Sequence, residues 1–204
     1  MEYNHNNEES KYYNNNYRYE NIFSIPLILN HILQYLDKNN LKCFYLINKK
    51  IYQIYCNQVK KIKINNEAKI SNLQVIDKYN NVINLDLSFC NNIKDFTPIS
   101  KLERLEILNI SFINISDISF LEKNKIIKKL DISRCEKIKD FTPISKLERL
   151  EILNANWTYI SDISFLEKNN IIKELDISNC PKIKDFSPIS KLEKLEILDI
   201  RYAN

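Results

Sequence analysis

The 204-residue chain contains no glycine. An average protein is about 7% glycine, and the loops that cradle phosphates or dinucleotides depend on it for close backbone approach. A glycine-rich nucleotide-binding loop is therefore excluded. Asparagine is abundant and tolerates a positive φ better than most other residues, so we expect it at the tight-turn positions.

Histidine is almost as scarce, with only His5 and His31 in the whole chain. A nucleophile activated by histidine would need His31, which lies among helical apolar residues. No Cys/His spacing matches a zinc site, so a zinc-dependent ligase domain is also excluded. We expect a chain that is not an enzyme and that has no catalytic residue, metal or cofactor.

Long apolar runs are absent, including any that would fit a signal peptide or a membrane span. The 30 basic and 26 acidic residues are evenly spread, which argues against a nucleic-acid partner and against a membrane partner. The five cysteines show no pairing logic, which is typical of a reducing compartment. We expect an intracellular, cytoplasmic protein, and a nuclear location is not excluded.

What the sequence does contain is repetition. The letters IKDFTPISKLERLEILN run from Ile93 to Asn109, recur unchanged from Ile138 to Asn154, and recur slightly edited from Ile183 to Asp199. Aligned on L-x-[LI], successive strand leucines are separated by 22 or 23 residues. These are Leu85, Leu108, Leu130, Leu153, Leu175 and Leu198. This period lies within the range of leucine-rich repeats.

The same register extends toward the N-terminus. Stepping back 23 residues from Leu85 predicts seven apolar positions, all of which are apolar: Ile62, Ile64, Ile70, Leu73, Ile76, Tyr79 and Val82. The array is therefore predicted to span residues 59–204, with six complete repeats and the strand of a seventh. Each repeat should form a strand, a turn and an irregular or 3₁₀ segment.

The segments DFTPISKLERL and DISFLEKN resemble the DISPLAxLTNL sequence motif of internalin-type short leucine-rich repeats. The fold class that follows is an α/β solenoid, a curved array with a parallel sheet on its concave face. Cys90, Cys135 and Cys180 recur where such repeats place an inward-facing residue. They are two strands apart, roughly 9.6 Å, which is too far for disulfides, so we expect buried thiols.

Two segments precede the array. Residues 1–21 are rich in asparagine and tyrosine and are predicted to be a disordered tail. Residues 22–58 have apolar residues at helical spacing, interrupted by DKNN. Within them, ILQYLDKNNL and FYLINKKIY resemble an F-box, although the opening IPLILNHI is one residue shorter than the family pattern and lacks its acidic residue.

The F-box resemblance implies docking on a Skp1-like adaptor of an SCF-type ubiquitin ligase. The implied adaptor contacts are Pro26, Leu29, Ile32, Leu36, Leu41 and Ile47. With the repeats holding a target protein, the chain would be a non-catalytic substrate receptor. The alternative is a free-standing leucine-rich-repeat interaction scaffold whose N-terminal helices only cap the solenoid.

Residues that alternate with the strand leucines are predicted to face outward on the concave side, where solenoids bind partners. Four sets stand out: an acid and amide ladder, a polar column two positions further on that includes Ser111, Ser133 and Ser178, a column rich in aromatics, and beside it a column of isoleucines on every second repeat. The predicted target-binding residues are Asp86, Phe89, Ile107, Phe112, Asp131, Arg134, Ile152, Trp157, Asp176 and Tyr202. The alternative is that repeat duplication copied these residues and the ladder only solvates the sheet.

The chain ends in ILDIRYAN, directly after a predicted strand. An open strand edge invites pairing, so a homodimer through this edge is one expectation. Blunting of the edge by Arg201 and Tyr202, or descent from a longer protein, are the others.

Overall fold

The computed structural model describes residues 53, 56–64 and 70–203. The predicted tail and all six predicted adaptor contacts lie outside these residues, as does most of the F-box-like segment. In the described part of the chain no helix is long and apolar enough to cross a membrane.

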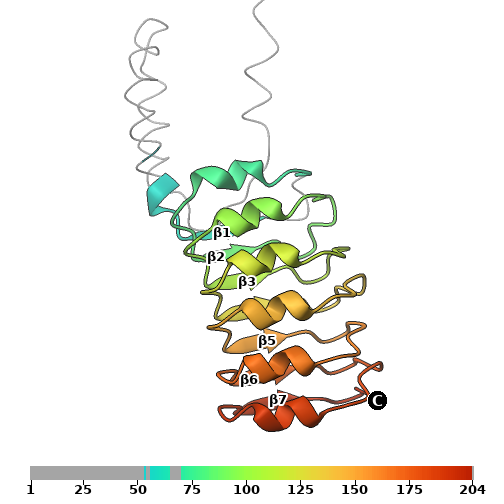
Figure 1. Cartoon of the computed structure of the whole chain (residues 1–204). Helices are drawn as coiled ribbons and strands as arrows, with labels where there is room; N and C mark the ends of the chain where they lie inside the picture. Colours follow the sequence, from blue (N-terminus) through green and yellow to red (C-terminus); the bar gives the residue numbers. More distant parts are fainter. Residues whose placement is uncertain (1–52, 54–55, 65–69, 204) are drawn as a thin grey trace, which may run out of the picture.

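In residues 56–64 and 70–203, seven short strands form one parallel sheet in which each strand pairs with the next along the sequence. In Figure 1 they are stacked in chain order from β1 to β7. The strands are β1 (Lys61–Lys63), β2 (Asn84–Asp86), β3 (Ile107–Asn109), β4 (Lys129–Asp131), β5 (Ile152–Asn154), β6 (Glu174–Asp176) and β7 (Ile197–Asp199). Their central residues pair in the predicted register, Ile62 with Leu85, then Leu85 with Leu108, and so on to Leu198. The solenoid prediction is confirmed.

Each strand except β7 is followed by a 3₁₀ segment, and Figure 1 shows these segments stacked in a row of their own. They are η2 (Gln74–Lys78), η3 (Thr97–Lys101), η4 (Ser119–Lys123), η5 (Thr142–Lys146), η6 (Ser164–Lys168) and η7 (Ser187–Lys191). Proline near the start of η3, η5 and η7 favours their helical φ. In η3 to η7 an aspartate accepts a hydrogen bond from the first backbone N–H of the segment, two residues further on, for example Asp140 Oδ1 from Thr142 N at 2.9 Å. Asn72 does the same for Gln74 N in η2.

One apolar core runs the length of the array between the strands and the 3₁₀ segments. The central leucines of β2 to β6 are at most 1% exposed. Five of the seven positions predicted for the first repeat are buried, and the other two, Ile70 and Tyr79, pack against the core. No repeat encloses this core by itself, so stacking supplies the burial that stabilises the array.

The repeated cysteines face this core, as predicted. Cys90, Cys135 and Cys180 are buried, free thiols. Each repeated thiol donates to a carbonyl of the preceding repeat, as Cys135 Sγ does to Ile110 O at 3.0 Å. Burial raises the pKa of Cys90 to about 11 and that of Cys135 to about 12, so these thiols are held in the protonated, unreactive form.

Candidate functional site

The acid and amide ladder lies one residue after each central strand residue. Its side-chain oxygens accept the backbone N–H two residues further on, at 2.9 to 3.2 Å. The acceptors are Asp86, Asn109, Asp131, Asn154, Asp176 and Asp199. The ladder therefore closes the turn after each strand. This is a structural role for the predicted target-binding residues Asp86, Asp131 and Asp176, alongside whatever they present to a partner.

The next outward position of the sequence pattern does not face solvent. Ser111 is 4% exposed, and Ser133 and Ser178 are each 5% exposed. The chain turns sharply just after the strand, so strict in-and-out alternation stops at this position. The expectation of an outward polar column is therefore wrong for these three serines.

The column after the serines has a left-handed backbone in every repeat from β2 onward. The positive φ values are 64° at Phe89, 57° at Phe112, 56° at Arg134, 54° at Trp157, 56° at Asn179 and 57° at Tyr202. Asparagine fills only one of these six positions, so our expectation that it takes the tight turns is wrong here. For bulky residues this conformation costs roughly 1–2 kcal/mol each.

Hydrogen bonding between repeats explains why the backbone holds this conformation. The N–H of Phe112 donates to Ser133 O at 2.9 Å, and that of Arg134 donates to Asn156 O at 2.9 Å. Phe89 and Trp157 do the same with Ser111 and Ser178. The stacking of repeats thus holds a positive φ at these four positions, whatever side chain occupies them.

Four of these side chains stack into one exposed surface, which we call the aromatic column: Phe89, Phe112, Arg134 and Trp157. The rings of Phe89 and Phe112 stack with centroids 4.4 Å apart. The Arg134 guanidinium lies 5.4 Å from the Phe112 centroid and 4.2 Å from that of Trp157. Phe89, Phe112 and Trp157 remain 47%, 39% and 44% exposed. Tyr202 is separated from the column by the repeat that carries Asn179.

The predicted isoleucine column is interrupted. Ile107, Ile152 and Ile197 occupy the first positions of β3, β5 and β7, and in the sheet they alternate with Lys129 and Glu174. Ile107 and Ile152 are half-buried, whereas Ile197 is 57% exposed. They lie at the strand starts, and the aromatic column lies beyond the strand ends, so the ladder separates the two sets.

A row of alternating charges borders the isoleucines. Lys128 pairs with Glu106 at 2.9 Å, and Lys173 pairs with Glu151 at 2.7 Å. The hydrogen bond from Lys173 lowers the pKa of Glu151, and the same bond raises the pKa of Lys173. These pairs are solvent-exposed, so they add little stability and mainly keep this border neutral.

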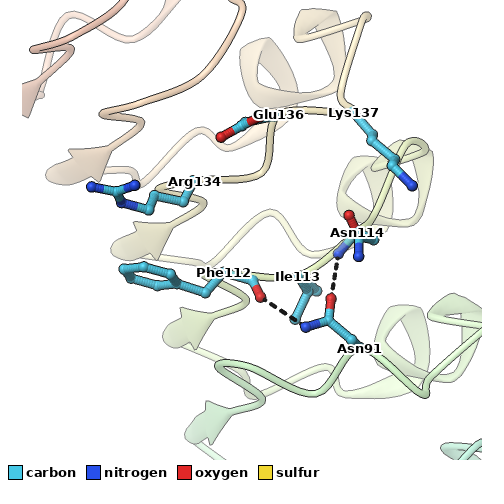
Figure 2. Close-up of a pocket in the computed structure, with 7 residues that line it drawn as sticks. All are labelled: Asn91, Phe112, Ile113, Asn114, Arg134, Glu136 and Lys137. Carbon is cyan, nitrogen blue, oxygen red and sulfur yellow. Dashed lines mark hydrogen bonds between the residues drawn. The ribbon is translucent and has the colours of Figure 1, made fainter.

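A shallow hollow of about 260 Å³ lies beside the aromatic column, between the turns of adjacent repeats. Figure 2 shows Arg134 and Phe112 extending side by side on one side of the turn, with Lys137 and Asn114 on the other. Asn91 fixes the turns to each other, since its Nδ2 donates to Phe112 O at 3.4 Å and its Oδ1 accepts from Asn114 N at 2.9 Å. Among the described residues no three acidic, histidine or cysteine side chains gather as a metal site would require.

Comparison of the copies inside the chain points to the same surface. Segments 85–129 and 130–174 differ at eleven positions, and nine of these lie in turns 87–92 and 110–114 or their counterparts. Sequence alone could have located the variable surface by this comparison, but it could not show that Phe112, Arg134 and Trp157 stack.

Comparison with known proteins finds the same repeat architecture in solved structures. No family model matches the chain, and no curated protein does. Among solved structures, an internalin (inlF) of Listeria monocytogenes is 29% identical with a TM-score of 0.64, and an internalin C2 (inlC2) of the same organism is 26% identical with a TM-score of 0.64. The chain has the leucine-rich-repeat fold.

The two internalin comparisons each cover 70% of this chain, but only 41% and 62% of the internalin chains. A leucine-rich-repeat protein of Leptospira interrogans, LIC12759, is 18% identical with a TM-score of 0.56, and the match covers 72% of this chain and 38% of that one. Leucine-rich-repeat solenoids offer extended surfaces for protein interaction.

Proposed function

We propose that this chain is a non-catalytic protein-interaction module that binds a target protein through its aromatic column and the adjoining ladder. The observation that carries this proposal is the set of bulky side chains held exposed at positive φ. Strain of this kind is typical of binding sites. Trp and Arg are also the residues that most often dominate protein interfaces.

We further propose that the module serves as a substrate receptor of an SCF-type ubiquitin ligase. This role is supported by the F-box resemblance of residues 23–55 and by their place directly before the repeats. The receptor contributes no chemistry of its own. It holds the target near a ligase assembled on the adaptor, which raises the effective concentration of the target's lysines there. The proposal includes an intracellular location, which agrees with the free, buried thiols of Cys90, Cys135 and Cys180.

The receptor role is tested by calorimetric titration of the full chain with Skp1. We expect sub-micromolar binding that is lost in Leu36→Asp and unchanged in Trp157→Ala, because the F-box resemblance assigns Leu36 to the adaptor contact, whereas Trp157 belongs to the aromatic column. Thermal unfolding of Leu36→Asp checks that the array remains folded. Absence of binding by the folded wild-type chain would overturn the receptor role and leave the interaction module.

The target-binding surface is tested by quantitative affinity capture from cell extract. Proteins captured by the wild type should be depleted with Trp157→Ala. Glu122→Ala is the matched control, because Glu122 is exposed in η4 on the 3₁₀ side of the array. Equal capture by wild type and Trp157→Ala would remove the aromatic column from the proposal.

A further inference from the structure

Arg134 differs from the other members of the left-handed column because it alone carries a charge. Its guanidinium lies against Trp157 and Phe112, with ring centroids at 4.2 and 5.4 Å. The N–H groups of a guanidinium lie in its own plane and point outward, so rings stacked on its faces do not cover them. The rings therefore restrain the side chain while the donors at its outer edge remain accessible to solvent.

These donors have no acceptor within the described part of the chain. The Arg134 guanidinium makes no hydrogen bond or ion pair there, and its contacts are the two rings. Arg201 provides the contrast, since its Nε and Nη2 bind Asp199 at 2.6 to 3.2 Å. The protein thus neutralises Arg201 with its own Asp199 and leaves the donors of Arg134 available to a partner.

Restraint of this kind lowers the cost of binding. A free arginine side chain has roughly 2 kcal/mol of rotamer entropy to lose, and stacking removes part of it before a partner arrives. The group that matches a guanidinium edge with two parallel hydrogen bonds is a carboxylate. Rings on both sides of Arg134 would also exclude water from that pair, which strengthens it.

The neighbouring turns add positive charge. Lys182 lies over the Tyr159 ring at 4.4 Å, and Lys137 lines the hollow beside Arg134. Against these cations the same turns carry Glu136. In the preceding copy, the positions of Arg134 and Lys137 are held by the uncharged Phe89 and Asn92, so the charge belongs to this part of the array.

We infer that the aromatic column is a carboxylate receptor: an Asp or Glu side chain of the target protein binds the outer edge of Arg134, with apolar groups beside it on Trp157 and Phe112. This inference rests on the proposed function and specifies its partner. The ladder aspartates beside the column would repel a continuous polyanion, which favours an isolated protein carboxylate over a nucleic-acid backbone.

The experiment is selection of a random displayed peptide library on the full chain, in parallel with three variants. Arg134→Gln removes the charge and the fork of donors. Arg134→Lys keeps only the charge. Lys123→Gln is a charge-matched control, because Lys123 is exposed in η4 on the 3₁₀ side of the array. Both positions are exposed, and thermal unfolding verifies that each variant is folded.

We expect wild type and Lys123→Gln to enrich peptides with Asp or Glu at one fixed position next to apolar residues, and both Arg134 variants to lose that preference. An enriched peptide is then titrated while the fluorescence of Trp157, the only tryptophan of the chain, is followed. Replacing its Glu or Asp by Gln or Asn should weaken binding to the wild type at least about tenfold and leave binding to Arg134→Gln unchanged.

The outcomes separate the two proposals. Peptides that lose affinity with Trp157→Ala but show no acidic preference would overturn the carboxylate receptor and leave the interaction module standing. Failure of the folded chain to enrich any peptide would count against both. Binding of single-stranded oligouridine that is tighter than that of the peptides and depends on Arg134 would overturn the protein partner as well.

Discussion

The 3₁₀ side of the array and the turns that follow its strands belong to the same repeats but vary in opposite ways. Residues 93–107, which include η3, are identical letter for letter to residues 138–152, which include η5. In the turns, residues 87–92 differ from residues 132–137 at four of six positions. One part of the repeat was kept and the other changed.

Burial and backbone geometry account for the part that was kept. Pro143 and Ile144 in η5 are buried, and Asp140 holds the first N–H of that segment. A change at such a position would cost packing or a hydrogen bond in a stack where every repeat touches the next. The turns hold their backbone by hydrogen bonds between repeats, so their exposed side chains can change without loss of the fold.

The largest effect on stability should come from the buried core, where Leu130 is the same residue as its counterpart Leu85 in the preceding copy. Leu130 is fully buried at the centre of β4, and Leu130→Ala should lower the free energy of unfolding by about 2–5 kcal/mol. Lys129→Ala, one residue earlier and exposed, should change it by less than about 0.5 kcal/mol. Urea denaturation measures both, and equal effects would contradict the distinction.

A gain in stability is expected from a substitution in the turns that follow the strands. Tyr202 has φ 57°, is 78% exposed and stacks on no ring among the described residues. Tyr202→Gly should therefore raise the free energy of unfolding by about 1 kcal/mol, because glycine adopts positive φ without steric cost. Asn179→Gly, at the equivalent position, should have a smaller effect, since asparagine tolerates this conformation. Destabilisation by Tyr202→Gly would show that the positive φ carries no strain.

The column itself should show energetic coupling. A double-mutant cycle of Arg134→Ala and Trp157→Ala, followed by urea denaturation, should give an interaction free energy of about 0.5–1 kcal/mol. The same cycle between Arg134 and the exposed Glu122 of η4 should give none. A zero value for both pairs would mean that the stack does not restrain Arg134 in solution.

The smallest effect concerns acid. Hydrogen bonds from Thr97 and Thr142 lower the pKa of Asp95 and Asp140 below the ordinary 3.8. A lowered pKa in the folded state gives stability that is present above pH 3.8 and is lost as the pH falls through the folded-state pKa. Denaturation midpoints measured from pH 5 down to pH 2 should therefore fall less steeply in the double variant Asp95→Asn, Asp140→Asn. Parallel curves for this variant and the wild type would contradict the assignment.

Much of the architecture was predictable because burial in a solenoid is periodic. Each strand must turn an apolar residue inward, so Leu85 and Leu108 alone determine the register, and even the divergent first repeat conforms to it through Ile62. The thiol positions followed from the same period. The sequence pattern failed where exposure depends on neighbouring repeats, as at the buried Ser133. It also did not predict that the ladder residues close the turns, as Asp131 does by accepting from Ser133 N.

The candidate site was predicted as a list of residues and not as an arrangement. Phe112, Arg134 and Trp157 were correctly grouped by their place in the repeat, and the structure brings them into contact. Ile107 and Ile152 were placed beside them, but the ladder lies between. The sequence pattern shows which face a residue joins, and distances along that face depend on where the strand ends and the turn begins.

The amino-acid sequence by itself determined the repeat length, the order of the strands and the inward positions, because these depend on the spacing of apolar residues. Only the tertiary structure decided that five bulky side chains adopt the left-handed conformation and that Arg134 lies between two rings without an acceptor. The reason is that, for four of these five residues, the controlling hydrogen bonds join backbone atoms 21 or 22 residues apart, such as Arg134 N and Asn156 O. Bonds of that kind form only when the repeats are stacked, and no local preference of Phe, Trp or Arg would reveal them.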